Sequence, residues 1–149
     1  MNNGDIWIID EDMDEQDLIR EVATDLKLEN KFVYLTKADE VLDLLEEITE
    51  APFLIICELH LPKMNGFKLR EVILTHDERK YKSVPFIFWT TQASEQQVKD
   101  AYDLSAHGFF IKEDSYEEMK KTFLMILQYW SKSKMPAKSE DYARGAMSK

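Results

Sequence analysis

Hydrophobic positions along the chain alternate between short continuous runs and longer segments in which they recur every three or four residues. The short runs have the length of strands, are rich in β-branched and aromatic residues, and are bounded by polar or turn residues. They lie at Ile6–Ile9, Phe32–Leu35, Phe53–Cys57, Phe86–Trp89 and Phe109–Ile111. The third and fourth are hydrophobic throughout, as expected for parallel strands that are covered on both faces. The pattern predicts five strands.

Five segments with helical spacing follow these strands in turn. In the first, Leu18, Val22 and Leu26 recur at four-residue intervals and predict a helix with one apolar stripe. The other four segments are marked by Val41, Leu44, Leu45 and Ile48, by Leu69, Val72 and Ile73, by Val98, Ala101, Tyr102 and Ser105, and by Met119, Phe123, Ile126, Leu127 and Trp130. Five strands that alternate with five helices predict an α/β fold, a three-layer, doubly wound, five-stranded parallel sheet.

Three hydroxyl residues have the spacing of capping boxes at the starts of predicted helices. The pairs are Thr36 with Asp39, Ser94 with Gln97, and Ser115 with Glu118. We therefore expect these three residues to cap the second, fourth and fifth helices.

Polar residues stand at the carboxyl ends of four predicted strands, the edge where open parallel α/β sheets bind their ligands. Asp10 and Glu11 follow the first strand, Glu58 the third, Thr90 the fourth and Lys112 the fifth. The carboxylates are hard oxygen ligands of the kind that Mg²⁺ prefers. A hydroxyl and an ammonium beside them suit the oxygens of a phosphoryl group. The sequence thus predicts one shared site at this edge.

Four motifs at these strand ends resemble those of a known family. The segment E-L-H-L-P-K-M-N-G at residues 58–66 resembles the phosphoacceptor loop of response-regulator receivers, usually D-x-x-[LM]-P-x-[MG]-[DN]-G. IWIIDED resembles the family's acidic-pair strand, PFIFWTT the strand that ends in a phosphoryl-contacting hydroxyl, and HGFFIK the segment with an aromatic residue three positions before an invariant lysine. The motifs occur in the family's order, and the resemblance covers residues 4–130.

The resemblance implies a CheY-like, flavodoxin-like fold and a receiver module of a two-component phosphorelay, which signals through protein contacts and is not an enzyme. The residues that it assigns to a Mg²⁺ ion are Asp10, Glu11, Glu58 and His60, the last through its backbone carbonyl. The residues that it assigns to phosphoryl contact and switching are Thr90, Phe109 and Lys112. The implied partners are a sensor histidine kinase or a downstream signalling protein.

The phosphate-accepting position departs from the family, because Glu58 replaces the aspartate. The additional methylene moves the carboxylate by roughly 1.3 Å, and displacements of about 1 Å can cost on the order of 10²-fold in a positioned reaction. Glu58 can mimic a phosphorylated aspartate, accept phosphate poorly, or neutralise Lys112 as a structural pair. We expect a pseudo-receiver with phosphorylation weakened or lost and with weak Mg²⁺ binding. The alternatives are a receiver that uses Glu58 as its acceptor and a purely structural interaction domain.

A second departure follows the lysine, where Glu113 stands in place of the family's cis-proline. A cis bond without proline costs about 2.5–4 kcal/mol, so we expect a trans peptide here and a changed direction for the Lys112 ammonium.

Other interpretations apply to single residues. Asp10 and Glu11 can form an acidic turn before a helix, where acidic residues are favoured. Thr90 can be a simple strand end, and Phe109 a core aromatic. A nucleotide-binding enzyme would need a glycine-rich phosphate loop after the first strand, and residues 10–15 are acidic instead, which excludes that class.

Composition and charge restrict the partners. The 149-residue chain has a formal net charge of −10, which argues against nucleic-acid binding. No apolar run reaches the roughly 20 residues of a membrane span, and no secretory signal is visible. A single cysteine, Cys57, fits a cytoplasmic location. Residues 131–149 carry five basic and two acidic side chains without apolar periodicity, and we expect a flexible or loosely docked extension there.

The fifth predicted helix is apolar nearly all round at residues 123–127, which predicts burial on more than one side. We therefore expect a homodimer through helix four, strand five and helix five, with Tyr102, Phe109 and Leu124 among the contacts.

Overall fold

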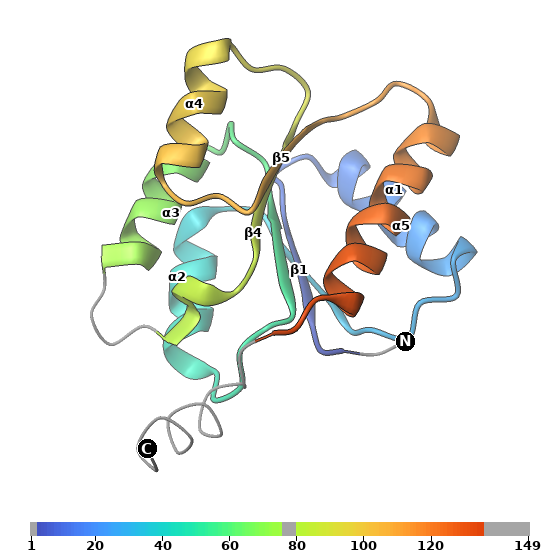
Figure 1. Cartoon of the computed structure of the whole chain (residues 1–149), viewed down its shortest axis with the longest axis horizontal. Helices are drawn as coiled ribbons and strands as arrows, with labels where there is room; N and C mark the ends of the chain where they lie inside the picture. The colour runs from blue at the N-terminus through green and yellow to red at the C-terminus, as the bar shows by residue number, and fades with distance from the viewer. Residues whose placement is uncertain (1–2, 76–79, 136–149) are drawn as a thin grey trace.

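The chain folds into five parallel strands and five α-helices, as seen in a computed structural model that describes residues 3–75 and 80–135 (Figure 1). The strands are β1 (Ile6–Ile9), β2 (Phe32–Leu35), β3 (Leu54–Cys57), β4 (Phe86–Thr90) and β5 (Gly108–Ile111). The helices are α1 (Met13–Asp25), α2 (Ala38–Glu47), α3 (Gly66–Thr75), α4 (Glu95–Asp103) and α5 (Tyr116–Lys132). A short 3₁₀ turn at Lys80–Ser83, which the hydrophobic pattern did not predict, precedes β4.

The sheet has the strand order β2-β1-β3-β4-β5, and every neighbouring pair is parallel. Ile9, the last residue of β1, is level with Leu35 of β2 and with Cys57 of β3. The residues that follow these strands therefore emerge side by side at one edge of the sheet.

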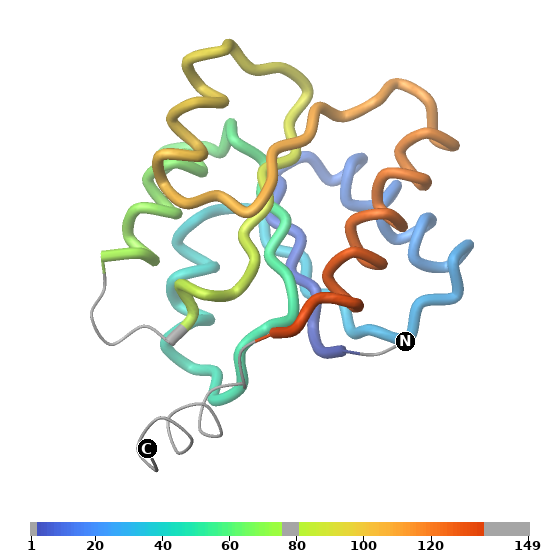
Figure 2. Tube along the Cα trace, viewed as in Figure 1, coloured from blue at the N-terminus to red at the C-terminus, as the bar shows by residue number. Residues whose placement is uncertain are grey.

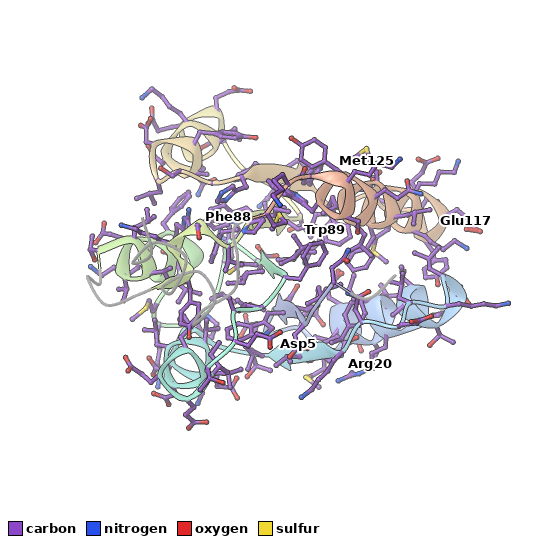
Figure 3. All side chains as sticks on the ribbon, turned by 60° about the horizontal axis from the view of Figure 1, so that its bottom comes forward. Asp5, Arg20, Phe88, Trp89, Glu117 and Met125 are labelled. Atoms are coloured by element: carbon purple, nitrogen blue, oxygen red, sulfur yellow. The ribbon has the colours of Figure 1, made fainter. Side chains whose placement is uncertain are left out.

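Helices cover both faces of the sheet and make the three predicted layers. α1 and α5 lie on one face, and α2, α3 and α4 lie on the other (Figure 1). Successive strand residues alternate between the two resulting cores, since side chains along a strand point to opposite faces. Phe88 of β4 packs in the core beneath α2 and α3, whereas Trp89 packs against Phe123 of α5 (Figure 3). The predicted fold class is confirmed.

Two of the three predicted helix caps are confirmed. Ser94 and Gln97 form a reciprocal capping box at α4, and the Ser115 hydroxyl accepts a hydrogen bond from the Glu118 amide at α5. The prediction for Thr36 is wrong: α2 begins after Lys37, which has no side-chain cap.

Thr36 is engaged by a different acid than expected. Its amide and its hydroxyl both donate to Glu40 Oε1, each at 2.7 Å. These bonds from Thr36 lower the pKa of the Glu40 carboxyl. Glu40, four positions after Thr36, therefore makes the contact with Thr36 that the capping-box spacing predicted for Asp39.

The two described ends of the chain meet at the end of the sheet opposite the strand carboxyl ends (Figure 2). Asn3 Nδ2 donates to Ser131 Oγ at 2.9 Å, and Met135 packs against the core between the sheet and α1 and α5. α5 ends at Lys132, two residues past the domain boundary predicted at residue 130. The rest of the predicted extension, residues 136–149, lies outside the described residues. None of the helices in the described ranges is long and apolar enough for a membrane crossing.

Candidate functional site

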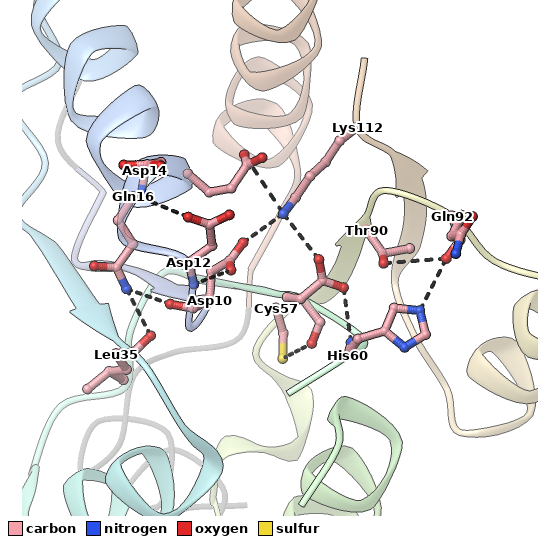
Figure 4. A network of polar contacts seen from close by, with 12 residues as sticks. Asp10, Asp12, Asp14, Gln16, Leu35, Cys57, His60, Thr90, Gln92 and Lys112 are labelled. Atoms are coloured by element: carbon pink, nitrogen blue, oxygen red, sulfur yellow. Dashed lines mark hydrogen bonds and ion pairs between the residues drawn. The ribbon is translucent and has the colours of Figure 1, made fainter. Parts of the chain in front are cut away.

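The start of α1 is fastened to the strand ends by a buried glutamine. Gln16 Nε2 donates to the carbonyl oxygen of Asp10 at 2.8 Å and to that of Leu35 at 3.1 Å (Figure 4). Asp10 directly follows β1, and Leu35 is the last residue of β2. Asp12 caps α1, and its own amide donates to Asp10 Oδ1 at 2.9 Å. These hydrogen bonds fix the backbone and one carboxylate oxygen of Asp10 without any contribution from Glu58 or Lys112.

The second oxygen of Asp10 belongs to an ion cluster centred on Lys112. Lys112 Nζ lies 2.7 Å from Asp10 Oδ2 and 3.2 Å from Glu58 Oε1 (Figure 4). A third carboxylate oxygen, Glu15 Oε2 of α1, lies 3.9 Å away. The structure thus brings together three residues that sequence reasoning placed at this edge. It adds Glu15, which that reasoning missed.

Burial and charge act in opposite directions on this cluster. Burial alone would lower the pKa of Lys112, but the hydrogen bond and charge of Asp10, with the charges of Glu58 and Glu15, hold that pKa above its usual value. Burial raises the pKa of the Glu15 carboxyl, although the nearby Lys112 charge acts to lower it. Lys112 is therefore a permanent cation at neutral pH, shared among carboxylates from β1, β3 and α1.

Both carboxylate oxygens of Glu58 have partners. Oε1 pairs with Lys112, and Oε2 accepts a hydrogen bond of 3.0 Å from the His60 amide. The side chain is buried, with the residue only 8% exposed. Gly66 permits the tight loop that follows, because a Cβ there would lie 2.9 Å from the Glu58 carbonyl oxygen and 2.8 Å from the Phe88 ring. The loop thus places the Glu58 carboxylate so that each of its oxygens has a hydrogen-bond partner.

Two further residues predicted for the site, Thr90 and Phe109, lie on β4 and β5. Thr90 is fully buried at the end of β4, and its hydroxyl donates at 3.5 Å to the carbonyl oxygen of Gln92 (Figure 4). The same carbonyl lies 3.3 Å from His60 Nε2. The ring of Phe109 is half-buried and packs on Phe88, with 5.8 Å between the ring centroids. The contacts of the Thr90 hydroxyl and of the Phe109 ring are therefore with Gln92 and Phe88, and not with Glu58.

Glu11 is not among the carboxylates that pair with Lys112, and its assignment to a Mg²⁺ ion stays a prediction. It is exposed in the turn between β1 and α1, and no ion pair or hydrogen bond among the described residues links its carboxylate to Lys112. Asp10 is buried and pairs with Lys112, whereas Glu11 is exposed to solvent. Glu15, one helical turn further along α1, supplies the third carboxylate instead.

The site's fit to Mg²⁺ is partial. Asp10, Glu58 and the His60 carbonyl offer the oxygen ligands that Mg²⁺ takes. Yet nowhere in residues 3–75 and 80–135 do three or more histidine, cysteine or acidic side chains form a group that could hold a metal ion. The Lys112 ammonium lies between the two buried carboxylates and is the cation that pairs with both of them.

The segment after Lys112 does not turn the lysine side chain away from the site. The Lys112–Glu113 peptide is trans, as predicted, yet the ammonium still reaches the site. The Glu113 carboxylate is directed to α5, where it accepts from the Thr122 hydroxyl at 2.8 and 3.0 Å. A cleft of about 290 Å³ lies beside this segment and reaches Glu15, Thr91 and Lys112.

Known proteins share this fold and its sequence pattern. A curated relative, the probable methanogenesis regulatory protein FilR2 of Methanothrix harundinacea (strain 6Ac), is 28% identical over 79 residues, 53% of this chain and 50% of FilR2. The match therefore spans about half the length of that relative. The phosphorylated cyanobacterial phytochrome response regulator RcpA has a TM-score of 0.79 at 18% identity, over 90% of this chain and 99% of RcpA.

A second solved structure bears on the metal. The receiver domain of the sensor histidine kinase PA1611 from Pseudomonas aeruginosa PAO1, solved with magnesium coordinated in its active-site cleft, has a TM-score of 0.69 at 17% identity. The likeness covers 87% of this chain and 98% of that domain, and at this identity it shows the shared fold.

The sequence itself matches the response regulator receiver domain family over residues 6–123, which contain β1 to β5 and every residue of the ion cluster. With that match and the parallel sheet in the order β2-β1-β3-β4-β5, the chain belongs to the response regulator receiver domain family, the CheY-like signalling modules of two-component systems.

Proposed function

We propose that this receiver signals through protein–protein contacts with phosphorylation weakened or lost, and that Glu58 is its fixed negative charge. The observation that carries the proposal is the engagement of Glu58 at the acceptor position. One of its oxygens pairs with Lys112 and the other accepts the His60 amide. A nucleophilic carboxylate needs a free oxygen aimed at the incoming phosphorus atom, and a placement that is wrong by about 1 Å weakens such a reaction on the order of 10²-fold.

Glu58 can replace a phosphorylated aspartate only in part. A phosphoryl group brings nearly two negative charges and three strong acceptor oxygens, whereas a glutamate has one charge and two oxygens. Here those two oxygens reach Lys112 and the His60 amide, and the Thr90 hydroxyl donates elsewhere. The proposed module thus has the lysine contact of an activated receiver without the hydroxyl contact.

We propose that Mg²⁺ binds this site weakly, through the carboxylates of Asp10, Glu11 and Glu58 and the carbonyl of His60. Receivers of this fold include one solved with magnesium in its cleft. In this chain the ion would have to displace or share carboxylates with Lys112, whose ammonium is 2.7 Å from Asp10. The competition between the two cations supports low affinity.

Receiver domains interact with histidine kinases or with downstream proteins, and we propose that this one acts in the cytoplasm on a partner of either kind. A homodimer through α4, β5 and α5 is a further proposal. Large side chains are exposed on these elements, namely Tyr102 (53%), Ile111 (46%), Met125 (51%) and Tyr129 (63%). Exposed apolar surface of this kind marks interaction sites. Of the contacts expected from the sequence, Tyr102 is exposed, whereas Phe109 and Leu124 are half-buried.

The proposal predicts that shortening Glu58 restores phosphate acceptance. We expect Glu58→Asp, treated with acetyl phosphate and Mg²⁺, to gain about 80 Da in intact-mass spectrometry, the mass of one phosphoryl group. If Glu58→Asp stays unmodified, the defect lies in the segment after Lys112. The double variant Glu58→Asp with Glu113→Pro should then gain the mass, with Glu113→Pro alone as the matched control. A double variant that remains unmodified would contradict the proposal that Glu58 is what blocks acceptance.

A further inference from the structure

Helix α3 carries a fully buried arginine outside the ion cluster. Arg70 is 0% exposed, and its side chain reaches the end of a neighbouring helix. Its Nε donates to the Leu104 carbonyl oxygen at 3.0 Å, and its Nη2 donates to the Ser105 carbonyl oxygen at 2.8 Å. The guanidinium carbon also lies 5.2 Å from the centre of the Phe86 ring of β4. Arginine is almost never fully buried unless it is paired, so this position requires an explanation.

No carboxylate in the described ranges balances the Arg70 charge. Burial lowers the pKa of its guanidinium to about 10, which leaves it charged at neutral pH. Its Nη1 atom is buried without a hydrogen-bond partner among the residues that the structure describes. The favourable contacts are those with two carbonyls at the negative end of a helix dipole and with an aromatic ring. The positive charge is thus held by the end of α4.

The end of α4 has a shape that presents these carbonyls. The Ala106 amide donates to the Ala101 carbonyl at 3.1 Å, and the Ser105 amide donates to the Tyr102 carbonyl at 3.0 Å, which is the Schellman pattern. Ser105 has φ 60°, a left-handed conformation that usually requires glycine. The turn leaves the carbonyls of Leu104 and Ser105 to accept the two Arg70 bonds.

Apolar burial anchors α4 only slightly. Ala101 is its single buried residue, whereas α5 buries Met119, Phe123, Ile126 and Leu127. A helix with so little buried surface has a small free-energy cost of local opening. Its position therefore depends on polar contacts to a degree that α5 does not share.

We propose that Arg70 is a positioning residue that ties the end of α4 to α3 and β4. It thereby holds the face formed by α4, β5 and α5, which includes Tyr102, in one arrangement. The two hydrogen bonds, from Nε to Leu104 and from Nη2 to Ser105, form what we call the Arg70 tether. The tether goes beyond the proposed function, since it holds whether or not Glu58 accepts a phosphoryl group. Phosphorylation of the wild-type chain would therefore leave this inference standing.

The test is amide hydrogen exchange in the full chain, resolved by helix, for Arg70→Met. Arg70→Met removes both hydrogen bonds of the tether and keeps an unbranched, apolar side chain at this position. We expect exchange in α4 to accelerate about tenfold, because hydrogen bonds to a charged group are among the stronger ones in proteins. Exchange in α1 and α5 should stay within about twofold of wild type.

The matched control is Lys68→Met, which removes an exposed cation from the same helix and should leave α4 unchanged. Arg70→Lys, which offers one ammonium in place of the two-armed fork, should give an intermediate rate in α4. Exchange in α4 at the wild-type rate in Arg70→Met, or an equal acceleration of all helices, would overturn the inference.

A measurement on the wild-type chain covers the case in which Arg70→Met does not fold. In arginine side-chain NMR, the tether predicts a slowly exchanging Arg70 Nε proton and restricted rotation of the guanidinium group. Fast exchange of that proton with water, as in exposed arginines, would likewise overturn the inference.

Discussion

The single residue Lys112 neutralises the carboxylates of the site, a role that a bound metal cation has in other carboxylate sites. Asp10 and Glu58 are both buried, and two buried carboxylates repel each other unless a cation lies between them. The ammonium of Lys112 contacts both of them. The site is therefore balanced by a residue of the chain itself.

We predict that Lys112→Ala destabilises the fold by about 3–5 kcal/mol, the usual cost of leaving buried charges without their partner. Mg²⁺ should restore part of that loss in the variant, because it can neutralise the same carboxylates, and it should stabilise the wild-type chain less. Urea unfolding with and without Mg²⁺ measures both effects. The control is Lys99→Ala, which breaks an exposed pair with Asp103. Equal unfolding midpoints for Lys112→Ala and wild type in both conditions would contradict the role of Lys112.

Glu15 predicts a pH dependence. Burial raises the pKa of its carboxyl above the ordinary 4.5, so the folded chain binds this proton more tightly than the unfolded chain does. The resulting stabilisation is complete below the unfolded pKa and is lost as the pH rises through the folded pKa. Glu15→Gln removes this loss, and its stability relative to wild type should rise as the pH is raised from about 4.5 to neutrality.

Urea midpoints measured across that pH range test the Glu15 prediction. Glu11→Gln is the matched control, because it removes an exposed carboxylate that lies outside the cluster. A stability difference between Glu15→Gln and wild type that falls with rising pH has the wrong sign for this account.

At the scale of elements, the exposed sides of α4, β5 and α5 set how the chain meets other proteins. β5 is an edge strand whose Ile111 is exposed, and α5 exposes Met125 and Tyr129 beside it. A pocket of about 180 Å³ between β5 and α5 is lined by Phe110 and Trp130, among other mainly apolar residues. The surface formed by β5 and α5 is therefore largely apolar and open to contact with another protein chain.

We predict that the chain sediments as a dimer at roughly 100 μM, a concentration that detects even weak self-association. Met125→Lys should shift the equilibrium toward monomer, because a charge at a covered apolar position loses its hydration. Met13→Lys is the matched control, since Met13 is equally exposed on α1, on a different element. Only monomer for the wild-type chain at that concentration, or an equal effect of both variants, would remove the proposed interface.

For the whole molecule, the arrangement of elements could be predicted because each strand and helix follows a period in the sequence. The predicted strand bounds differ from the observed ones by one residue at most, as with β3, which begins at Leu54 rather than Phe53. The grouping of Asp10, Glu58 and Lys112 follows from the parallel sheet, which aligns the strand ends. The orientation of Glu11 could not be predicted, because it depends on how the turn into α1 runs.

The residues that sequence reasoning missed are polar residues on helices. Glu15, Gln16 and Arg70 belong to amphipathic segments in which a polar residue is normally assigned to the solvent side. Gln16 and Arg70 are instead buried, and each donates to backbone carbonyls of another element. The only signal for Arg70 is its place three residues before Ile73, on the buried stripe of α3.

The central proposal is that Glu58 weakens or abolishes phosphorylation of this receiver, and intact-mass spectrometry of the wild-type chain tests it most directly. The chain is incubated with acetyl phosphate and Mg²⁺, and its mass is followed over time beside that of Glu58→Asp. The engagement of both Glu58 oxygens predicts an unchanged mass for the wild-type chain. A stable gain of about 80 Da that maps to Glu58 would contradict the account.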